Sequence, residues 1–225
     1  MPLDPTVFIV DDDLAIRQSL QWLLQSAALN VETYASAVEF FGQYDPERPG
    51  CLVLDLRMPG IDGLTLQDTL LREDIRLPII FITGHGNIPQ AVRAIQHGAV
   101  DFMEKPFDDQ VLLARIRQAL EMDRKHRAAQ TLATRIRGKI DRLTPRELQV
   151  MEAMAAGQAN KAIADHLGLS VRTVELYRHH IMNKLETHSL AEIVQMLTVY
   201  KQSQINDLRL PTRIFPGIDE EPANG

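Results

Sequence analysis

Acidic side chains follow two apolar segments in the first half of the chain. The triplet Asp11–Asp13 comes after Val7–Val10, and Asp55 comes after Leu52–Leu54. Carboxylates that meet in one pocket repel one another unless a cation joins them. Hard oxygen atoms in a small cluster favour Mg²⁺, which keeps open positions for a phosphoryl group. The pattern therefore indicates a metal-assisted reaction on a phosphoryl group.

A hydroxyl group and an ammonium group follow two further apolar segments. Thr83 closes the run Ile79–Thr83, and Lys105 follows Val100–Glu104. Beside a carboxylate and a metal ion, they provide the contacts that an in-line phosphoryl transfer needs around its equatorial oxygens. Any one of these residues alone is also explained as a helix cap or a loop residue. Their joint position after four apolar segments favours a phosphoryl-transfer site at Asp55.

These side chains need a fold that brings the ends of their segments together. Strands are expected at the short β-rich runs Val7–Val10, Val31–Ala35, Leu52–Leu56, Ile79–Thr83 and Val100–Glu104. Helices are expected where apolar residues recur at helical spacing, at Leu14–Ala27, Ile88–Gly98 and from Asp109 to about Ala133. Strands that alternate with helices predict a parallel sheet covered on both faces, which binds ligands beyond the carboxyl ends of its strands. The first half is therefore predicted to be an α/β domain.

Residues 7–120 resemble a response-regulator receiver domain. The resemblance is carried by Val10–Asp13, Asp55–Gly60, Ile82–Gly86 and Phe102–Phe107. It implies a flavodoxin-like fold with a five-stranded parallel sheet in the order 2-1-3-4-5. It also implies that a sensor histidine kinase transfers a phosphoryl group from its phosphohistidine to Asp55.

The same resemblance implies a role for each residue around Asp55. The expected Mg²⁺ ligands are Asp11, Asp12, Asp55 and the backbone carbonyl of Arg57, and the expected phosphoryl contacts and switch are Thr83, Lys105 and Phe102. The bond between Lys105 and Pro106 is expected to be cis, which fits a tight turn that aims the lysine.

Position 57 also separates this chain from a rival class of protein. A phosphatase that uses an aspartate nucleophile on a similar sheet places an aspartic acid there as the general acid. Arg57 cannot deliver a proton in that way, which argues against a phosphatase. Arg57 and His85 each lie two positions after a site residue, and our hypothesis is that they tune how fast water reaches the acyl phosphate. The alternative is that both are solvated loop residues.

The last third of the chain carries the pattern of a helix-turn-helix. Thr144–Glu147 forms a capping box with proline at the first helical position. That helix is expected to run to Ala156, and further helices are expected at Asn160–Leu167, from Ser170 to about Leu185 and at Ser189–Tyr200. In the third of these helices, one face is predicted to be core, and it carries Val174, Tyr177, Ile181 and Leu185.

Residues 141–200 resemble the four-helix output domain of the NarL/FixJ (LuxR-type) regulators. Leu143–Glu147 and Ser170–Leu185 carry this resemblance, so the whole chain resembles a FixJ-like two-component response regulator. The resemblance implies an all-α DNA-binding domain whose third helix reads the major groove. The expected DNA contacts are Lys161, Arg172, Thr173, Glu175, Leu176, Arg178, His179 and Lys184.

The length of 225 residues suits two modest domains. The expected division is a receiver at 1–122, a helical linker at 123–140, a DNA-binding domain at 141–202 and a flexible tail at 203–225. The net charge of −6 argues against a protein that coats nucleic acid through a general positive charge. Acidic residues also match the basic ones within 141–200, so binding by a monomer should be weak and should depend on dimerisation.

The expected partners follow from these two domains. They are a cognate sensor histidine kinase, double-stranded promoter DNA, RNA polymerase and a second copy of the chain, which pairs through residues 88–97, 100–104 and 111–120 on phosphorylation. No apolar run approaches the length that spans a bilayer, and the start does not resemble a signal peptide, so a cytoplasmic location is expected. The chain is expected to be a regulator rather than an enzyme, although the receiver assists its own phosphorylation and dephosphorylation.

Two alternatives concern the output domain. A zinc site at His166, His179, His180 and His188 is disfavoured, because adjacent histidines point to different helix faces and no thiolate or paired carboxylate joins them. An output domain that binds protein rather than DNA stays open, although the cations at Lys161, Arg172 and Lys184 favour phosphate contacts.

Overall fold

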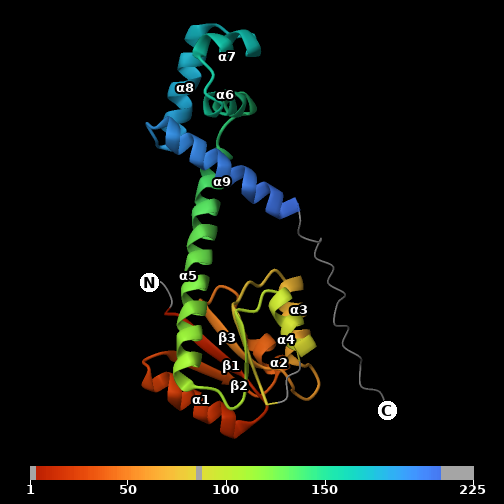
Figure 1. Cartoon of the computed structure of the whole chain (residues 1–225). Helices are drawn as coiled ribbons and strands as arrows, with labels where there is room; N and C mark the ends of the chain where they lie inside the picture. The colour runs from red at the N-terminus through yellow and green to blue at the C-terminus, as the bar shows by residue number, and fades with distance from the viewer. Residues whose placement is uncertain (1–3, 85–87, 209–225) are drawn as a thin grey trace, which may run out of the picture. The chain divides into compact units, whose positions relative to one another are not determined.

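The computed structural model describes residues 4–84 and 88–208 (Figure 1). It divides into two compact units, and the boundary between Gln130 and Thr131 falls within a helix. In the described residues, no helix combines the length and the apolar character that crossing a membrane requires.

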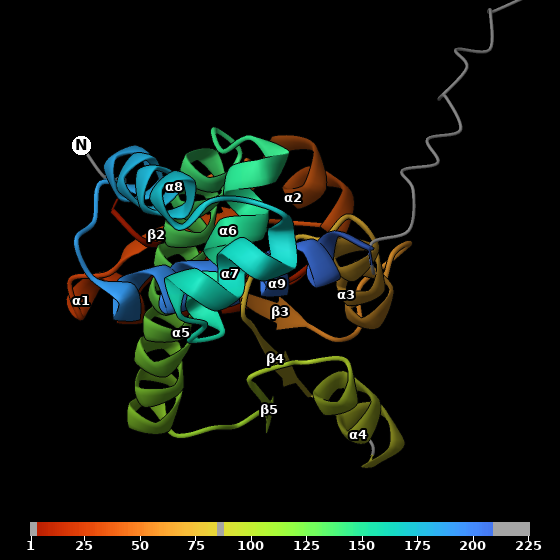
Figure 2. The ribbon, with the colours of Figure 1, turned by 90° about the horizontal axis from the view of Figure 1, so that it is seen from above.

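Unit 1 is built on a parallel sheet. Its strands are β1 (Thr6–Val10), β2 (Asn30–Tyr34), β3 (Gly50–Asp55), β4 (Ile79–Thr83) and β5 (Asp101–Glu104). They are ordered β2-β1-β3-β4-β5 with every pair parallel, which confirms the expected topology. Figure 2 shows β3, β4 and β5 in that order toward the side of the sheet where α4 lies. Every residue of β1, β3 and β4 is buried, as expected for central strands covered on both faces.

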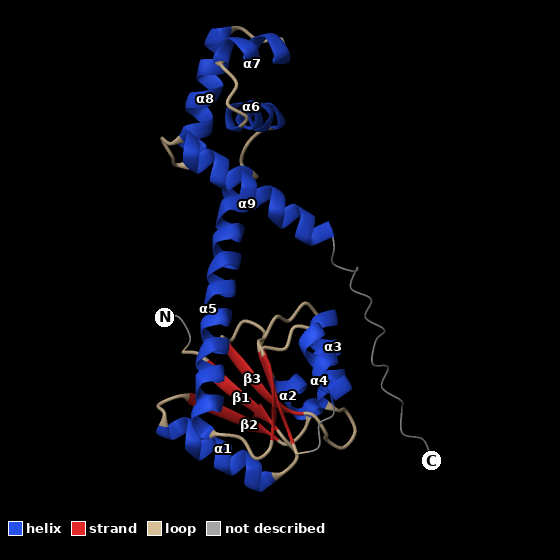
Figure 3. Cartoon of the chain, viewed as in Figure 1, coloured by secondary structure: helices blue, strands red, loops and turns tan. Residues whose placement is uncertain are grey.

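Helices cover both faces of this sheet (Figure 3). One face packs against α1 (Leu14–Ser26) and the first turns of α5 (Asp109–Ile140). The other packs against α2 (Ala37–Gln43), α3 (Gly63–Arg72) and α4 (Ile88–Gln96). Of these helices, α2 and α3 were not among those expected from the sequence. The seven residues of α2 are too few to establish a helical period, and α3 begins on a glycine.

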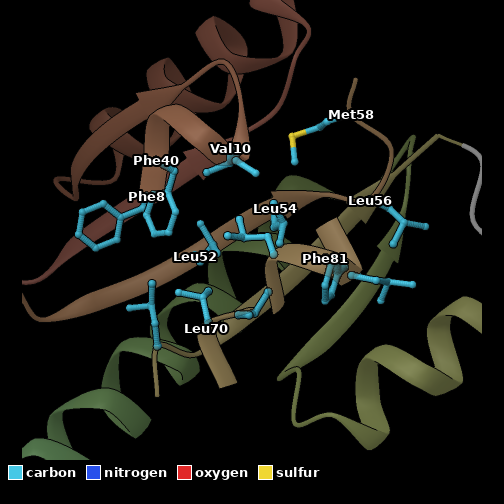
Figure 4. Packing of buried hydrophobic residues seen from close by; sticks show 14 of the residues in the cluster. Phe8, Val10, Phe40, Leu52, Leu54, Leu56, Met58, Leu70 and Phe81 are labelled. Atoms are coloured by element: carbon cyan, nitrogen blue, oxygen red, sulfur yellow. The ribbon is translucent and has the colours of Figure 1, made fainter. Parts of the chain in front are cut away.

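The core beneath α2 and α3 is dense and aromatic. Phe8, on β1, makes edge contacts with Phe40 and Tyr44, at centroid distances of 5.9 and 5.2 Å. Figure 4 shows the rings of Phe8 and Phe40 in one buried cluster with Leu52, Leu54 and Phe81 of the neighbouring strands. Each such fully buried apolar side chain contributes about 1.5–3 kcal/mol to folding. This packing fixes the strands whose ends carry the polar residues described below.

Helix α5 is longer than the sequence indicated, since it continues past the expected end near Ala133 to Ile140. Gly138 lies inside it, and a glycine costs a helix only about 0.5–1 kcal/mol relative to alanine. Ile136 and Ile140, on either side of Gly138, are both buried in the core of unit 2. Burial of these two side chains outweighs that cost, so the helix does not stop at the glycine.

Unit 2 contains the end of α5 together with α6 (Pro145–Ala155), α7 (Asn160–Leu167), α8 (Val171–Leu185) and α9 (Leu190–Leu208). Thr144 and Glu147 form the expected capping box at the start of α6. Gly168 ends α7 in a left-handed conformation (φ +65°), and the Ser170 side chain caps α8. Helix α9 extends past residue 203, where a tail was expected to begin, because no glycine or proline interrupts the chain before Pro211.

Candidate functional site

Four of the predicted site residues meet at the carboxyl edge of the unit 1 sheet. Asp11 follows β1, Asp55 ends β3, Thr83 ends β4 and Lys105 follows β5. The pairing register places these strand ends next to one another. Asp11, Asp55 and Thr83 are 1%, 6% and 1% exposed. The site therefore consists largely of buried polar groups at the carboxyl ends of the parallel strands.

The Lys105 side chain bridges the two buried carboxylates. Its Nζ donates to Asp11 Oδ2 at 2.7 Å and to Asp55 Oδ1 at 2.9 Å. Burial works to lower the pKa of Lys105, but the hydrogen bonds to both carboxylates outweigh it and raise that pKa. Burial raises the pKa of Asp55, and the hydrogen bond from Lys105 offsets only part of the increase. One ammonium thus faces two acidic groups, which favours binding of a further cation.

Backbone amides and an arginine hold the two carboxylates in place. The Arg57 amide donates to Asp55 Oδ2 at 2.7 Å, and the Asp13 amide donates to Asp11 Oδ1 at 2.9 Å. Arg17 Nη1 donates to the Asp11 backbone oxygen at 2.7 Å. Arg17 was not identified from the sequence, because its place at helical spacing in α1 gives no indication of a contact with the β1 end.

Gly63 is a second residue that sequence reasoning missed. A Cβ atom there would lie 2.5 Å from the Asp55 backbone oxygen and 3.0 Å from the Phe81 ring. The Gly63 amide also donates to the Leu56 backbone oxygen at 3.0 Å. Glycine therefore allows the first turn of α3 to pack against the end of β3. The sequence signal is slight, since Gly63 directly follows the α3 N-cap, Asp62.

The remaining predicted residues of unit 1 lie around this centre. Asp12 and Arg57 are exposed beside it, and Phe102 is half-buried with its ring centroid 6.2 Å from that of Phe81. The peptide bond between Lys105 and Pro106 is cis, which confirms that expectation. His85 lies outside the described residues, so its predicted effect on hydrolysis stays a prediction.

The donor set at this edge suits a small, hard cation. In the part of the chain that the structure describes, no group of three or more histidine, cysteine or acidic side chains is arranged as a metal site. Mg²⁺, however, binds through one or two carboxylates and retains several waters, so it does not need such a cage. Asp11 and Asp55 offer two buried carboxylates whose neighbours leave an excess of negative charge. The residues therefore fit a hydrated divalent cation.

In unit 2, α8 separates a core face from an exposed face. Val174, Ile181 and Leu185 are fully buried and Tyr177 is half-buried, which confirms the predicted core face. The exposed side chains on the other face include Arg172, Glu175, Leu176 and His179. Leu176 is 54% exposed, so its side chain is available for an apolar contact on this face.

The other predicted DNA contacts differ in how exposed their side chains are and in the partners they bind within the protein. Lys161 is exposed on α7, whereas Thr173 and Arg178 are half-buried on α8. The Thr173 hydroxyl lies 2.7 Å from the hydroxyl of Ser170, within the cap of α8. Lys184 Nζ donates to Glu147 Oε2 at 2.7 Å, so its ammonium has a partner inside the protein.

Glu147 is the centre of a buried network at the start of α6. It is 4% exposed, and its Oε2 accepts from the Thr144 amide at 2.7 Å as well as from Lys184. Burial raises the pKa of Glu147, but the hydrogen bonds from Lys184 and Thr144 outweigh it and hold the pKa below its usual range. The sequence indicated the capping box but not the lysine, which comes from a different helix.

The chain matches two family models. The model described as "Response regulator receiver domain" matches residues 7–117, and the model "Bacterial regulatory proteins, luxR family" matches residues 141–197. The chain is 47% identical over 190 residues to "Nodulation protein W" of Bradyrhizobium diazoefficiens, which covers 84% of each protein. It is 44% identical over 200 residues to "Transcriptional regulatory protein FixJ" of Azorhizobium caulinodans, over 87% of this chain and 93% of that one.

Among solved structures, the chain is similar to that titled "Low Resolution Structure of Response Regulator StyR". The TM-score is 0.79 at 44% identity, covering 88% of this chain and all of the other. Full-length FixJ from B. japonicum matches with a TM-score of 0.54 at 38% identity, covering 89% of this chain and 98% of that one.

The close approach at Gly63 predicts a loss of stability on substitution. Gly63→Ala should lower the free energy of unfolding by about 1–3 kcal/mol, because α3 or the end of β3 must shift to admit the methyl group. Urea-induced unfolding measures the change. Gly42→Ala in α2 is the matched control, since its Cβ would meet nothing within 4 Å, and it should be neutral or slightly stabilising. Equal effects of the two substitutions would contradict the steric argument.

The Glu147 network predicts a pH-dependent contribution to stability. Glu147→Gln should destabilise the protein by about 1.5–3 kcal/mol at neutral pH, since it removes a charge-assisted hydrogen bond. The folded-state pKa of Glu147 is depressed, so this contribution is complete above the ordinary glutamate pKa of about 4.3 and is lost as pH falls through the lower folded value. Urea unfolding of the wild type and Glu147→Gln from pH 7 to pH 3 should show the difference between their free energies of unfolding becoming smaller. A difference that stays constant with pH would contradict the role of the Glu147 charge.

Proposed function

Because this chain belongs to the family of response regulators that combine a receiver domain with a LuxR-type DNA-binding domain, we propose that Asp55 is its phosphoryl acceptor and α8 its DNA-reading helix. Phosphorylation of Asp55 promotes dimerisation and thereby raises affinity for a promoter sequence. The observation that carries the proposal is the contact of Lys105 with both Asp55 and Asp11 at the carboxyl edge of the sheet.

The proposed chemistry is a transfer between two side chains. An Asp55 carboxylate oxygen attacks the phosphorus atom of a phosphohistidine on the cognate sensor histidine kinase. A phosphorus–oxygen bond forms, the phosphorus–nitrogen bond breaks, and the released imidazole takes up a proton. The product is an acyl phosphate on Asp55. Lys105, 2.9 Å from the carboxylate, is placed to pair with the new phosphoryl oxygens, and Thr83 offers a hydroxyl from the neighbouring strand end.

The cation that fits this edge would be held by Asp11, Asp12, Asp55 and the backbone carbonyl of Arg57. Bound Mg²⁺ would neutralise the charge that collects on the equatorial phosphoryl oxygens. Within the chain itself, Arg17 and the amides of Asp13 and Arg57 orient the carboxylates before any partner binds. The receiver thereby assists its own phosphorylation and dephosphorylation, in the latter case by admitting water to the acyl phosphate.

Dimerisation is assigned to the face formed by α4, β5 and α5. Its exposed apolar side chains are Ile88 at 81%, Val92 at 48%, Ile95 at 47% and Val111 at 46% exposure. Apolar groups this exposed and this close in the fold are typical of a surface that is covered in a complex. Thr83 and Phe102 connect the acceptor to this face, since Thr83 ends β4 and Phe102 lies on β5. We infer that they move inward together when the phosphoryl group arrives.

The exposed face of α8 is proposed to enter the major groove. Glu175 can accept from cytosine N4, and Leu176 can pack on a thymine methyl. His179 lies on the same face. The phosphate contacts would be made by Arg172, Thr173, Arg178 and, from α7, Lys161. A phosphate contact by Lys184 would require its ammonium to be shared with Glu147.

The proposal retains the order of domains given by the sequence: a receiver at 1–122, a helical connection at 123–140, a DNA-binding domain at 141–202 and a tail at 203–225. The structure joins residues 123–130 to unit 1 and residues 131–140 to unit 2, and α9 continues to Leu208. The dimer on promoter DNA would act on RNA polymerase in the cytoplasm.

The central prediction concerns Asp55→Asn. With Mg²⁺ and BeF₃⁻, which mimics the phosphoryl group, the wild-type chain should double its mass in sedimentation and bind its promoter more tightly in gel shifts. Asp55→Asn should do neither, because the amide cannot coordinate beryllium. Asp74→Asn is the control, since this exposed acid has a left-handed conformation (φ +54°) that asparagine also adopts, and it should behave as wild type. A wild-type response in Asp55→Asn, or an unchanged mass in the wild type, would exclude the mechanism.

The DNA-reading face predicts a change in salt dependence. Arg172→Ala and Lys161→Ala should each weaken binding and reduce the slope of log K against log salt by about 1, if each cation meets one phosphate. Fluorescence anisotropy with the BeF₃⁻-activated chain at several salt concentrations measures the slope. The control is Lys201→Ala, which removes an exposed α9 lysine paired with Glu152 and should leave the slope unchanged. Equal slopes for all three variants would remove α7 and α8 from the interface.

A further inference from the structure

The part of α5 that begins at Asp123 was expected to act as a linker, yet its first turns are bonded to the sheet domain. Asp123 is 2% exposed, which is rare for a carboxylate without a specific partner. Unit 1 includes the helix as far as Gln130. The residues that lead out of the receiver therefore belong to its packed structure.

Asp123 binds the beginning of β3. Its Oδ2 accepts from the Gly50 amide at 3.0 Å, and both of its oxygens accept from Arg127 Nε at 3.0 Å. The buried carboxylate is thus paired with a cation and with a backbone amide, which is the condition for a charge to be stable away from water.

Arg127 extends the contact to the loop before β3. Its Nη2 donates to the backbone oxygens of Pro46 at 3.0 Å and Arg48 at 2.7 Å, and its Nη1 donates to that of Glu47 at 3.1 Å. A planar guanidinium can satisfy several acceptors at once in a fixed geometry, which the ammonium of a lysine cannot reproduce. One side chain therefore fastens a whole segment of loop to α5.

Close packing at the start of β3 restricts which residue can occupy position 50. A Cβ atom on Gly50 would lie 2.0 Å from the Thr6 backbone oxygen, so the start of β3 admits only glycine. Gly50 is the first residue of β3 and Asp55 is the last, and every residue between them is buried. A single rigid strand thus connects the amide that Asp123 holds with the carboxylate proposed to accept the phosphoryl group.

An ordinary surface ion pair is the simpler explanation of the spacing between Asp123 and Arg127, since residues four apart on a helix often pair. The chain provides such a pair for comparison. Arg124 bonds to Glu121 on the same helix, but its side chain is 70% exposed and the bond reaches no distant segment of the chain. Asp123 and Arg127 differ because they are buried or half-buried and because they bind backbone groups of a distant segment.

We propose that Asp123 and Arg127 are positioning residues that latch the helix leaving the receiver onto residues 46–50, so that a change at Asp55 is transmitted along β3 to α5. This inference rests on the proposed function of Asp55. The latch makes the first turns after the receiver a rigid extension of the sheet domain rather than a flexible connector. Without the latch, residues 121–130 lose their bonds to residues 46–50, and α5 is held to the sheet only by the apolar side chains of its first turns.

Hydrogen exchange on the full chain tests the latch itself. In Arg127→Ala, the amides of residues 46–50 and 121–130 should exchange about tenfold faster or more, while those of β4 are unchanged. Arg127→Lys, which keeps the charge but loses the fork of donors, should show the same change to a smaller extent. Arg124→Ala is the matched control, because it removes the same side chain one turn earlier, and it should leave both segments as in wild type. Protection of both segments in Arg127→Ala equal to that in Arg124→Ala would overturn the proposal.

A second readout tests transmission. The ratio of promoter affinities with and without BeF₃⁻ should fall toward 1 in Arg127→Ala and Arg127→Lys but not in Arg124→Ala. Incorporation of phosphoryl groups from acetyl phosphate should be the same in all of these variants, since Asp55 is at the other end of β3. A wild-type affinity ratio in a variant whose helix has lost protection would overturn the transmission role. Failure of the wild-type chain to accept a phosphoryl group would instead count against the proposed function of Asp55.

Discussion

The fold of the first unit depends on the requirement that two carboxylates buried at neighbouring strand ends share a cation. Asp11 and Asp55 lie at the ends of β1 and β3, where their charges would repel across a medium that screens them poorly. Lys105 resolves this, but it comes from beyond β5, which is two strands away from β3. The strand order, the burial of β4 and the turn after β5 are therefore all conditions for one ammonium to reach both acids.

Much of this centre could be predicted from the sequence because each residue follows a buried apolar run. Parallel strands bring their carboxyl ends to one edge, so the positions of Asp11, Asp55, Thr83 and Lys105 along the chain were enough. The α8 core face was predictable for a similar reason, since helical spacing alone separates it from the exposed face.

What could not be predicted are the contacts made between elements. Gly63 matters because of the backbone oxygen that it approaches, and Glu147 because of a lysine on another helix. Asp123 and Arg127 have the spacing of an ordinary surface pair, and only the structure shows that they bind the start of β3 and the loop before it, far away in the chain. The start of α5 at Asp109 was predicted correctly, but its C-terminal end was missed, since burial in a second core keeps the residues after Ala133 helical.

In the second unit, several cationic side chains bind groups of the protein itself. Arg146 donates to the Leu167 backbone oxygen at the end of α7, Lys139 donates to the Leu185 backbone oxygen at the end of α8, and Lys184 binds Glu147. Each of these stabilises a helix end or a buried acid, and none is wholly available to a phosphate. The small excess of positive charge on α7 and α8 would give one copy of the unit weak attraction to DNA, which supports the dimer in the proposed function.

The resting geometry of Asp55 has a consequence for fidelity. Both of its oxygens already accept hydrogen bonds, Oδ1 from Lys105 and Oδ2 from the Arg57 amide. A carboxylate whose oxygens accept hydrogen bonds in this way is a weaker nucleophile than a free one, so under the proposed function a small phosphorylated metabolite would react slowly with Asp55. Each oxygen keeps a second lone pair. A small donor such as acetyl phosphate can therefore still react, but a docked protein surface brings additional binding energy and is favoured over it. The hydrogen bonds that order Asp55 would thereby also favour a protein phosphoryl donor over small-molecule donors.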